Sequence, residues 1–282
     1  MGAMVEEYRR SLKSPEAEEI VDLIFYRPAG YLAVKAVYRL PVTPNQLTGI
    51  SLLAGLAAAW FFSAGAGPAL VWGGLLYLTA NILDCADGQL ARLKGNGTPL
   101  GRIVDGVADY VSSVAVFLAI GIGLASGGGS PWLLIVAAGA SSAVHAILFD
   151  KRLGAYMSAR RGERSFTVRE IEKFSGEIAR MSLEGRHHLK VFVMTLYMKY
   201  LRLQGGNGKR GGEENSPQDK RMIRFWSFLG PSTNRTVLVA AALAGRIDLY
   251  LWWIVLAGNL WLACCVILQR RPSGGRTSSR GG

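Results

Sequence analysis

Six apolar runs constrain the fold of this 282-residue chain more than any other feature. Each is close to the roughly 20 residues that an α-helix needs to cross the hydrocarbon core of a bilayer. The sequence therefore predicts an all-α, polytopic membrane bundle with six transmembrane helices. The run near 230–246 differs from the others because it is short and contains Arg235. The runs lie near residues 46–66, 68–92, 101–125, 131–149, 230–246 and 248–268.

The distribution of charge predicts the orientation of this bundle. The chain has 32 Lys and Arg against 20 Asp and Glu, a net charge of +12, yet 50% of its residues are hydrophobic. This combination indicates an integral membrane protein with cationic cytoplasmic parts and argues against a nucleic-acid partner. The loops "SAGAGP" and "SGGGSP" contain no Lys or Arg, and "AGRID" contains only Arg246. Because cationic loops favour the cytoplasm, both termini and the "RLKGNG" turn are predicted to be cytoplasmic.

Two segments lie outside the apolar runs. Residues 14–40 begin with Ser14-Pro15-Glu16, a pattern typical of a helix start, and then mix apolar, aromatic and cationic residues. We expect an amphipathic helix on the cytoplasmic leaflet, broken at Pro28. Residues 150–229 form a basic segment whose stretch "HHLKVFVMTLYMKYLRLQ" is amphipathic and is expected to pack on the bundle or on lipid.

These patterns predict a simple domain plan. It consists of an N-terminal cytoplasmic or interfacial unit (1–40), a six-span catalytic membrane domain with the basic insert 150–229 (41–270), and a disordered basic tail (271–282). Three cysteines, two of them adjacent, do not make a disulfide framework. His145 is expected to form a hydrogen bond between helices, and His187-His188 to lie on the surface.

An acidic cluster interrupts two of the apolar runs, in the stretch "NILDCADGQLARLKGNGTPLGRIVDGVADYVSS". Helical spacing places Asp84 and Asp87 on one face of the first helix, with Gly88 and Ala91, and it places Asp105 and Asp109 on one face of the second. An antiparallel hairpin around Gly95-Asn96-Gly97 would bring Asp87 to the depth of Asp105, and Asp84 to the depth of Asp109. We therefore expect two tiers of carboxylates facing each other near the cytoplasmic boundary.

Four carboxylates at this depth require cations. Each acidic residue costs on the order of 2.5–3.5 kcal/mol to place in the membrane, and neighbouring like charges repel further. Arg92 supplies one charge against four. Because no Cys or His is arranged among the carboxylates, the oxygen ligands favour Mg²⁺, Mn²⁺ or Ca²⁺ over zinc. Two such ions would balance the charge, and a metal pair about 4 Å apart stabilises phosphoryl displacement. A proton or ion pathway is the alternative use of such acids.

Small residues beside the carboxylates leave room for a ligand. Gly88 and Ala91 on the acidic face, and Gly101 at the start of the next helix, would let a flat group approach the backbone. Arg92 is placed to bind a phosphate. Taken alone, Gly88 and Gly101 would indicate close helix packing.

The pattern Asp84-x2-Asp87-Gly88-x2-Ala91-Arg92-x8-Gly101-x3-Asp105-x3-Asp109 resembles the signature of the CDP-alcohol phosphotransferase (CDP-alcohol phosphatidyltransferase) family. The six-span plan and the "TPN" at Thr43-Pro44-Asn45 are also similar to that family. The resemblance implies that an acceptor hydroxyl attacks the β-phosphate of a CDP-alcohol and displaces CMP, in phospholipid biosynthesis. It leaves room for a homodimer.

The resemblance also implies roles for the residues of the pattern. Asp84, Asp87 and Asp105 would hold two ions, Mg²⁺ or Mn²⁺, with Asp109 near them as a fourth metal residue and the general base. The nucleotide site would comprise Asp84, Gly88, Ala91, Arg92 and Gly101.

The donor and the acceptor stay open at this point. CDP-diacylglycerol with a small alcohol is favoured, whereas a choline- or ethanolamine-type transfer to diacylglycerol and a transfer between two polar substrates are alternatives. A divalent-cation transporter is the rival class, but it gives the Gly, Ala and Arg positions no purpose. Four basic residues after the fourth run could bind an acceptor phosphate, although ordinary anchoring charges would look the same. They are Lys151, Arg152, Arg160 and Arg161.

Overall fold

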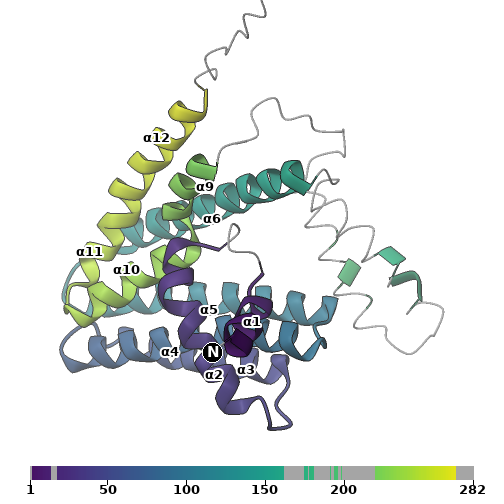
Figure 1. The fold of residues 1–282 in the computed structure, drawn as a ribbon. Coiled ribbons are helices and arrows are strands. Elements are labelled where there is room, and N and C mark those ends of the chain that lie inside the picture. Colours follow the sequence, from purple (N-terminus) through teal and green to yellow (C-terminus); the bar gives the residue numbers. More distant parts are fainter. Residues whose placement is uncertain are drawn as a thin grey trace, which may run out of the picture.

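The computed structural model of the chain describes residues 2–13, 18–161 and 220–270, with isolated positions between 175 and 198. Every regular element in this described part is helical, which confirms the predicted all-α class. Figure 1 shows α3, α4 and α5 running side by side, with α10, α11 and α12 at one end and α1 and α2 crossing in front. The elements are α1 (Gly2–Ser11), η1 (Asp22–Tyr26), α2 (Arg27–Val37), α3 (Pro44–Phe62), α4 (Pro68–Lys94), α5 (Pro99–Ser126), α6 (Trp132–Arg161), α9 (Lys220–Trp226), η2 (Ser227–Leu229), α10 (Pro231–Leu243), α11 (Ile247–Trp252), η3 (Trp253–Gly258) and α12 (Asn259–Arg270).

Five helical segments of the described part are long and apolar enough to cross a membrane, so the predicted count of six is not confirmed. The difference lies at α10, which has 13 residues. At about 1.5 Å per residue it extends roughly 20 Å, less than the roughly 30 Å of the hydrocarbon core. Gly230-Pro231 at its start and the left-handed turn at Gly245 (φ 68°) limit its length. The five candidates are Pro44–Phe62, Pro68–Lys94, Leu100–Ser126, Trp132–Met157 and Ile247–Gln269.

Local signals fix the ends of the helices around the acidic cluster. Thr43 accepts a hydrogen bond from the Gln46 N–H while the Gln46 side chain accepts from the Thr43 N–H, which makes a capping box at the start of α3. Gly95 ends α4 in the left-handed conformation at φ 63°. The side chain of Thr98 accepts from the Gly101 N–H and starts α5. The predicted turn between the two acidic helices is therefore present.

The prediction of a break at Pro28 is wrong. Residues 20–37 are continuously helical, with the π-helical turn η1 directly before α2. The Arg27 N–H donates to the Asp22 carbonyl oxygen, so the wider turn accommodates the proline within the first residues of α2. The expected helix start at Ser14-Pro15-Glu16 lies outside the described residues, and an interfacial location for this unit stays a prediction.

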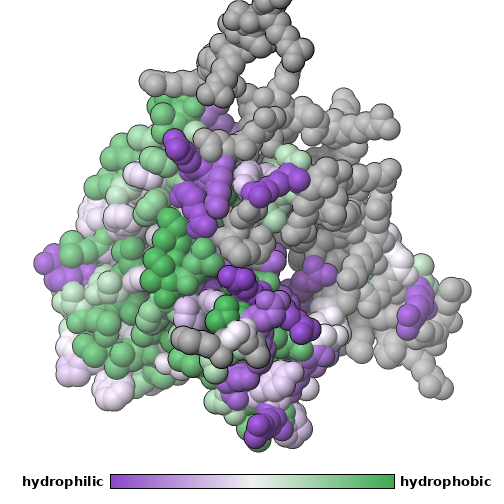
Figure 2. Space-filling model, in the orientation of Figure 1, coloured by the Kyte–Doolittle hydropathy of each residue, from purple (hydrophilic) through white to green (hydrophobic). Residues whose placement is uncertain are grey.

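Large apolar side chains point outward from the long helices. Trp60 on α3 is 78% exposed and Leu133 on α6 is 84% exposed. Figure 2 shows hydrophobic residues over the side formed by α11, α12 and α4, and hydrophilic residues near α1. A soluble monomer rarely exposes such continuous apolar surface, so these faces fit contact with lipid.

Helix α6 is longer than the apolar run that predicted it. It continues past Asp150 to Arg161, so the four basic residues proposed for the acceptor lie on the extension of a spanning helix. His145 on α6 lies 3.0 Å from Asn259 Oδ1 on α12, which confirms the expected bond between helices. The three cysteines are free, as predicted. His187-His188, most of the basic insert and the tail 271–282 lie outside the described residues.

Candidate active site

The two acidic helices form a hairpin that is open along its length. Helix α3 packs along both α4 and α5, whereas α4 and α5 hardly touch each other. The space between them is filled by side chains from α3, α4, α5 and α10. The turn predicted between the two acidic helices is therefore present. The two helices do not pack directly against each other, however, and α3 lies against both of them.

Three of the four aspartates meet in this space. One carboxylate oxygen from each of Asp84, Asp87 and Asp105 lies within 4.8 Å of the other two. Asp87 is buried, and Asp84 and Asp105 are half-buried. The Thr48 hydroxyl on α3 donates to Asp87 Oδ2. The sequence did not single out Thr48, since one hydroxyl in an apolar run is common.

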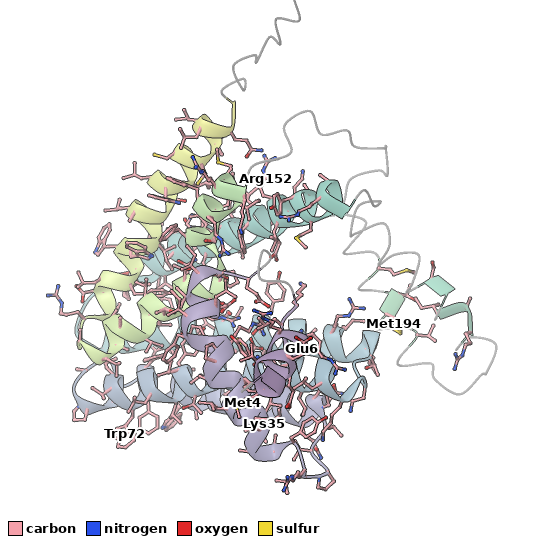
Figure 3. All side chains as sticks on the ribbon, in the orientation of Figure 1. Met4, Glu6, Lys35, Trp72, Arg152 and Met194 are labelled. Atoms are coloured by element: carbon pink, nitrogen blue, oxygen red, sulfur yellow. The ribbon has the colours of Figure 1, made fainter. Side chains whose placement is uncertain are left out.

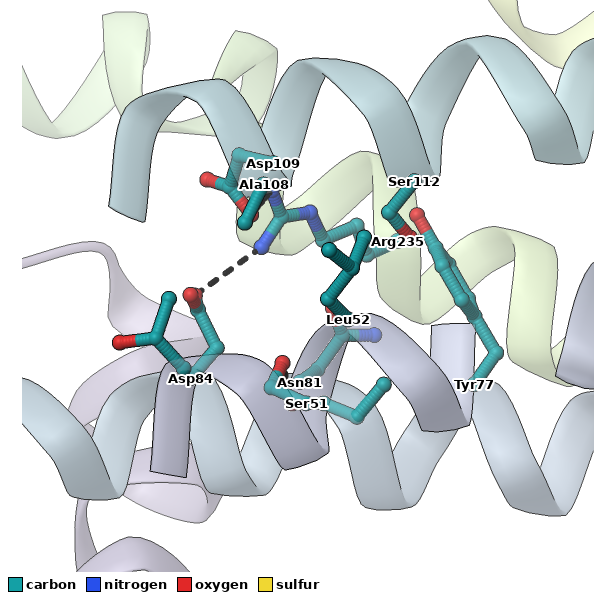
Figure 4. Close-up of a pocket in the computed structure, with 11 residues that line it drawn as sticks. Ser51, Leu52, Tyr77, Asn81, Asp84, Ala108, Asp109, Ser112 and Arg235 are labelled. Carbon is teal, nitrogen blue, oxygen red and sulfur yellow. Dashed lines mark hydrogen bonds and ion pairs between the residues drawn. The ribbon is translucent and has the colours of Figure 1, made fainter. Parts of the chain in front are cut away.

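Asp109 reaches the same space through a different contact. Its Oδ1 atom lies 2.8 Å from Arg235 Nη2, and Arg235 Nη1 lies 3.3 Å from Asp84 Oδ2. Figure 4 shows the Arg235 guanidinium between Asp84 on α4 and Asp109 on α5. Asp84 and Asp109, which were expected to lie at the same depth, are thus joined by the guanidinium of Arg235. Sequence reasoning missed this role, although a lone Arg in an apolar run is a signal of a functional or paired residue.

A small cavity continues from this ion pair toward the core of the bundle. The space available to the centre of a water molecule is about 10 Å³, roughly one water. The Asn81 side chain is 5% exposed, and its Nδ2 atom has no hydrogen-bond partner in the described part of the chain. The lining residues are Thr48, Ser51, Leu52, Tyr77, Ala80, Asn81, Asp84, Ala108, Asp109, Ser112 and Arg235.

The residues expected to shape a nucleotide site lie beside the cluster in two groups. Arg92 Nε donates to the carbonyl oxygen of Ser11, at the end of α1. A Cβ on Gly88 would lie 3.4 Å from Arg92 Nη1, so this glycine leaves the space that the guanidinium borders. A Cβ on Gly101 would lie 2.9 Å from Asn45 Oδ1, so Gly101 permits close packing of α5 against α3. Ala91 is half-buried on α4.

Of the four basic residues proposed for the acceptor, the structure describes the side chains of Lys151, Arg152 and Arg160, and none of these three is brought to the cluster. Arg152 lies over the Trp226 ring, 5.6 Å from its centre, and Arg160 Nη1 donates to the Tyr156 hydroxyl over 3.1 Å. Figure 3 labels Arg152 on α6, beside α9. Among the described side chains, neither these two nor Lys151 line the cavity beside Arg235. Arg161 ends α6.

The donor set of the cluster fits a hard divalent cation. It supplies three carboxylates with oxygens close enough to share one ion, and no thiol or imidazole belongs to this group. Arg235 offsets one negative charge of the four aspartates, so cationic charge is still needed at the site. The residues present therefore suit Mg²⁺ or Mn²⁺.

The same part of the chain matches known proteins. The sequence profile of the CDP-alcohol phosphatidyltransferase family matches residues 41–183, about half of the chain. Among curated relatives, a phosphatidylinositol phosphate synthase of Corynebacterium glutamicum is 36% identical over 86 residues, 30% of this chain and 38% of the relative. One from Mycobacteroides abscessus is 34% identical over 101 residues, 36% of this chain and 44% of the relative. An archaetidylinositol phosphate synthase of Pyrococcus horikoshii is 32% identical over 89 residues, 32% and 46% of the two chains.

The helical membrane-type fold and the acidic cluster between its helices agree with these matches. The chain belongs to the CDP-alcohol phosphatidyltransferase family. It matches less than half the length of each of the three relatives. The acidic cluster lies within residues 41–183, the segment that the family profile matches.

Proposed function

We propose that the protein transfers a phosphatidyl group from CDP-diacylglycerol to a hydroxyl of a small, phosphorylated polyol and releases CMP. The observation that supports this most is the cluster of Asp84, Asp87 and Asp105 within the family segment, with Asp109 beside it. The names of the relatives support an inositol phosphate as acceptor. A lipid donor can enter sideways from the leaflet through the open hairpin, and a polar acceptor can enter from water.

In this proposal the aspartates divide the work. Asp84, Asp87 and Asp105 would hold two divalent cations, Mg²⁺ or Mn²⁺, with Asp109 adjacent. When bound, these ions neutralise the diphosphate and stabilise the CMP leaving group. Thr48 fixes the Asp87 carboxylate through its hydroxyl, which preserves the orientation of a ligand oxygen.

Asp109 is proposed as the general base. Its side chain is 42% exposed, so an acceptor hydroxyl can approach it. Asp109 takes the hydroxyl proton, the acceptor oxygen bonds to the β-phosphorus, and the bond from that phosphorus to the oxygen of CMP breaks. Arg235 orients the Asp109 carboxylate through the 2.8 Å contact.

The nucleotide is proposed to lie over Gly88, Ala91 and Gly101, with Arg92 on a phosphate. The Arg92 Nη2 atom is buried without a partner in the described part of the chain, which supports a further acceptor for this guanidinium. The site and both termini are proposed to face the cytoplasm, following the cationic loops.

The test is CMP release by the purified protein in nanodiscs. CDP-diacylglycerol with inositol phosphate should support release that stops with EDTA and returns with Mg²⁺ or Mn²⁺. Persistent release in excess EDTA would contradict a metal-dependent transfer. CMP with Mn²⁺ should also raise the melting temperature, because a ligand that binds only the native state stabilises it. Metal flux into vesicles without any cytidine effect would instead indicate a transporter.

A further inference from the structure

The start of α10 is capped by a residue from the N-terminal segment. The Glu19 carboxylate accepts hydrogen bonds from the Ser232 N–H (3.0 Å), the Thr233 N–H (2.9 Å) and the Thr233 hydroxyl (2.9 Å). The N-cap residue of α10 is Gly230, which has no side chain for this task. The first N–H groups of a helix lack hydrogen-bond partners within the helix. Glu19, from a distant part of the sequence, provides the acceptor oxygens that an N-cap side chain would normally provide.

The residue at position 230 has to be small for this contact to form. A Cβ built on Gly230 would lie 2.1 Å from Glu19 Cδ and 2.4 Å from each carboxylate oxygen. Gly230 has φ −67° and ψ 156°, a conformation open to any residue. The glycine is therefore explained by the space that Glu19 occupies and not by backbone strain. Glu19 is 4% exposed, so water has little access to replace these contacts.

The same N-terminal segment also forms hydrogen bonds to the residues next to Asp84 and Arg235. Tyr26 Oη lies 3.1 Å from Thr236 Oγ1, next to Arg235. Arg27 Nη1 donates over 3.3 Å to the carbonyl oxygen of Cys85, next to Asp84.

The contact with Cys85 is itself held in place. A salt bridge of 2.8 Å to Glu18 fixes the Arg27 guanidinium. The segment from Glu18 to Arg27 thus joins α4 to α10 on either side of the ion pair.

We propose that Glu19 is a positioning residue for the transfer reaction, and that it acts through the start of α10 by holding Arg235 where it meets Asp84 and Asp109. It lies outside residues 41–183, so the family match does not cover it. Arg235 lies two residues after Thr233, within the same helical turn, so a shift of the α10 start moves its guanidinium directly. The effect on turnover rests on the proposed transferase activity.

The first test compares Glu19→Gln with Glu7→Gln in the full-length protein in nanodiscs, at about pH 8. Glu7 pairs with Lys35 at the surface, so its substitution is a matched control in the same N-terminal unit. Glu19→Gln is expected to lower kcat about tenfold, the effect of losing one to two hydrogen bonds, with little change in the KM for the donor. Glu7→Gln should leave both unchanged.

Mn²⁺ affinity, followed by electron paramagnetic resonance, separates positioning from general damage. In Glu19→Gln, Arg235 should compete less for Asp84, so Mn²⁺ should bind more tightly while turnover falls. A parallel fall of Mn²⁺ affinity, turnover and melting temperature would overturn the proposal in favour of a merely structural role. Unchanged turnover and unchanged Mn²⁺ affinity would overturn it as well.

A double-mutant cycle tests the contact itself. Gly230→Ala should displace the Glu19 carboxylate and reproduce most of the loss of Glu19→Ala. Adding Gly230→Ala to Glu19→Ala should cost little more, because the clashing carboxylate is gone. Additive losses would contradict a shared unit. If the wild type releases no CMP from any donor, the proposed function fails, while the same cycle in melting temperature and Mn²⁺ affinity still decides the role of Glu19.

Discussion

Arg235 on α10 and Asp109 on α5 form an ion pair of 2.8 Å, although 126 positions separate them in the chain. The same guanidinium contacts Asp84 on α4 at 3.3 Å, so three helices meet at one cation. A cation between two carboxylates reduces their repulsion and sets the direction of each. The pair therefore connects the proposed base with one of the proposed metal ligands.

Arg235→Gln should reduce CMP release by about a hundredfold or more, because Asp109 loses its orientation and Asp84 its cationic neighbour. Arg235→Lys should recover only part of this activity, since one ammonium does not bridge both carboxylates with the guanidinium geometry. Arg246→Gln is the matched control, because Arg246 pairs with Asp248 at an exposed site. Full activity of Arg235→Gln would show that the bridge has no role in turnover.

The aspartates should separate by role when each is changed to Asn. Asp84→Asn and Asp105→Asn should lose Mn²⁺ binding and turnover together, because both belong to the group of three oxygens. Asp109→Asn should keep Mn²⁺ and CMP binding and lose turnover, since its proposed task is to take a proton. Isothermal titration calorimetry measures the Mn²⁺ affinity of each variant, and the CMP-release assay measures its turnover. An equal loss of Mn²⁺ affinity in all three variants would make Asp109 a metal ligand.

The acidic cluster was predictable because its information is local. The spacing of Asp84 and Asp87 on one helix, and of Asp105 and Asp109 on the next, requires only helical periodicity and the Gly95 turn. Arg235 and Thr48 were not predictable in the same way. Their contacts depend on how α10 and α3 pack against α4, and a single sequence does not specify those distances.

The fold shows the same division. The caps at Thr43 and Thr98 and the turn at Gly95 fixed the limits of α3, α4 and α5 close to the expected residues. The apolar run at 230–246 was recognised as short, but the sequence did not reveal that α10 has only 13 residues or that Glu19, from a distant segment, caps its start. The length of α6 was underestimated since charged residues can continue a helix beyond the membrane.

Thr48→Val should weaken Mn²⁺ binding about tenfold or more and lower turnover, because Asp87 loses its buried hydroxyl donor. Losing one partner of a ligating carboxylate typically costs about 10–100-fold in metal affinity or activity. Thr48→Ser keeps the hydroxyl and should retain most of both. Equal behaviour of the Val and Ser variants would show that the hydroxyl has no specific role, and a loss in the Ser variant alone would assign the effect to the methyl group.

The stability of the protein should depend on pH through Glu19. Burial, together with the neighbouring Asp22 carboxyl, raises the pKa of Glu19 from an ordinary 4.5 to about 7, while the N–H groups of Ser232 and Thr233 oppose the shift. Because the folded-state pKa is the higher one, the protonated form stabilises the fold below about pH 4.5, and this contribution is lost as the pH rises through about 7. The melting temperature of the wild type minus that of Glu19→Gln should therefore decrease between about pH 5 and about pH 8. A constant difference, or one that grows with pH, would contradict this linkage.

The choice of substrates is tested by a panel of donors and acceptors. CDP-diacylglycerol, CDP-choline and CDP-ethanolamine are each offered inositol phosphate, glycerol phosphate, inositol, serine and diacylglycerol, with CMP release as the measurement. We expect CDP-diacylglycerol to be the productive donor, because α4 and α5 hardly touch each other and the long helices expose apolar side chains that fit contact with lipid. A phosphorylated acceptor should exceed serine, since the basic end of α6 can raise its local concentration. Turnover of CDP-choline or CDP-ethanolamine with diacylglycerol, and none with CDP-diacylglycerol, would overturn the proposed donor.

The basic end of α6 provides the last prediction. Neutralising Lys151, Arg152, Arg160 and Arg161 together should raise the acceptor KM severalfold and leave the KM for CDP-diacylglycerol nearly unchanged, because the three of them with described side chains do not line the cavity at Asp84. Added salt should reduce the difference between variant and wild type, since screening weakens attraction at a distance. Neutralising Arg9 and Arg10, exposed on α1, removes similar charge elsewhere and should have little effect. Arg152→Gln alone should lower the melting temperature through its lost contact with Trp226. A quadruple variant with an unchanged acceptor KM would assign these four residues to membrane anchoring.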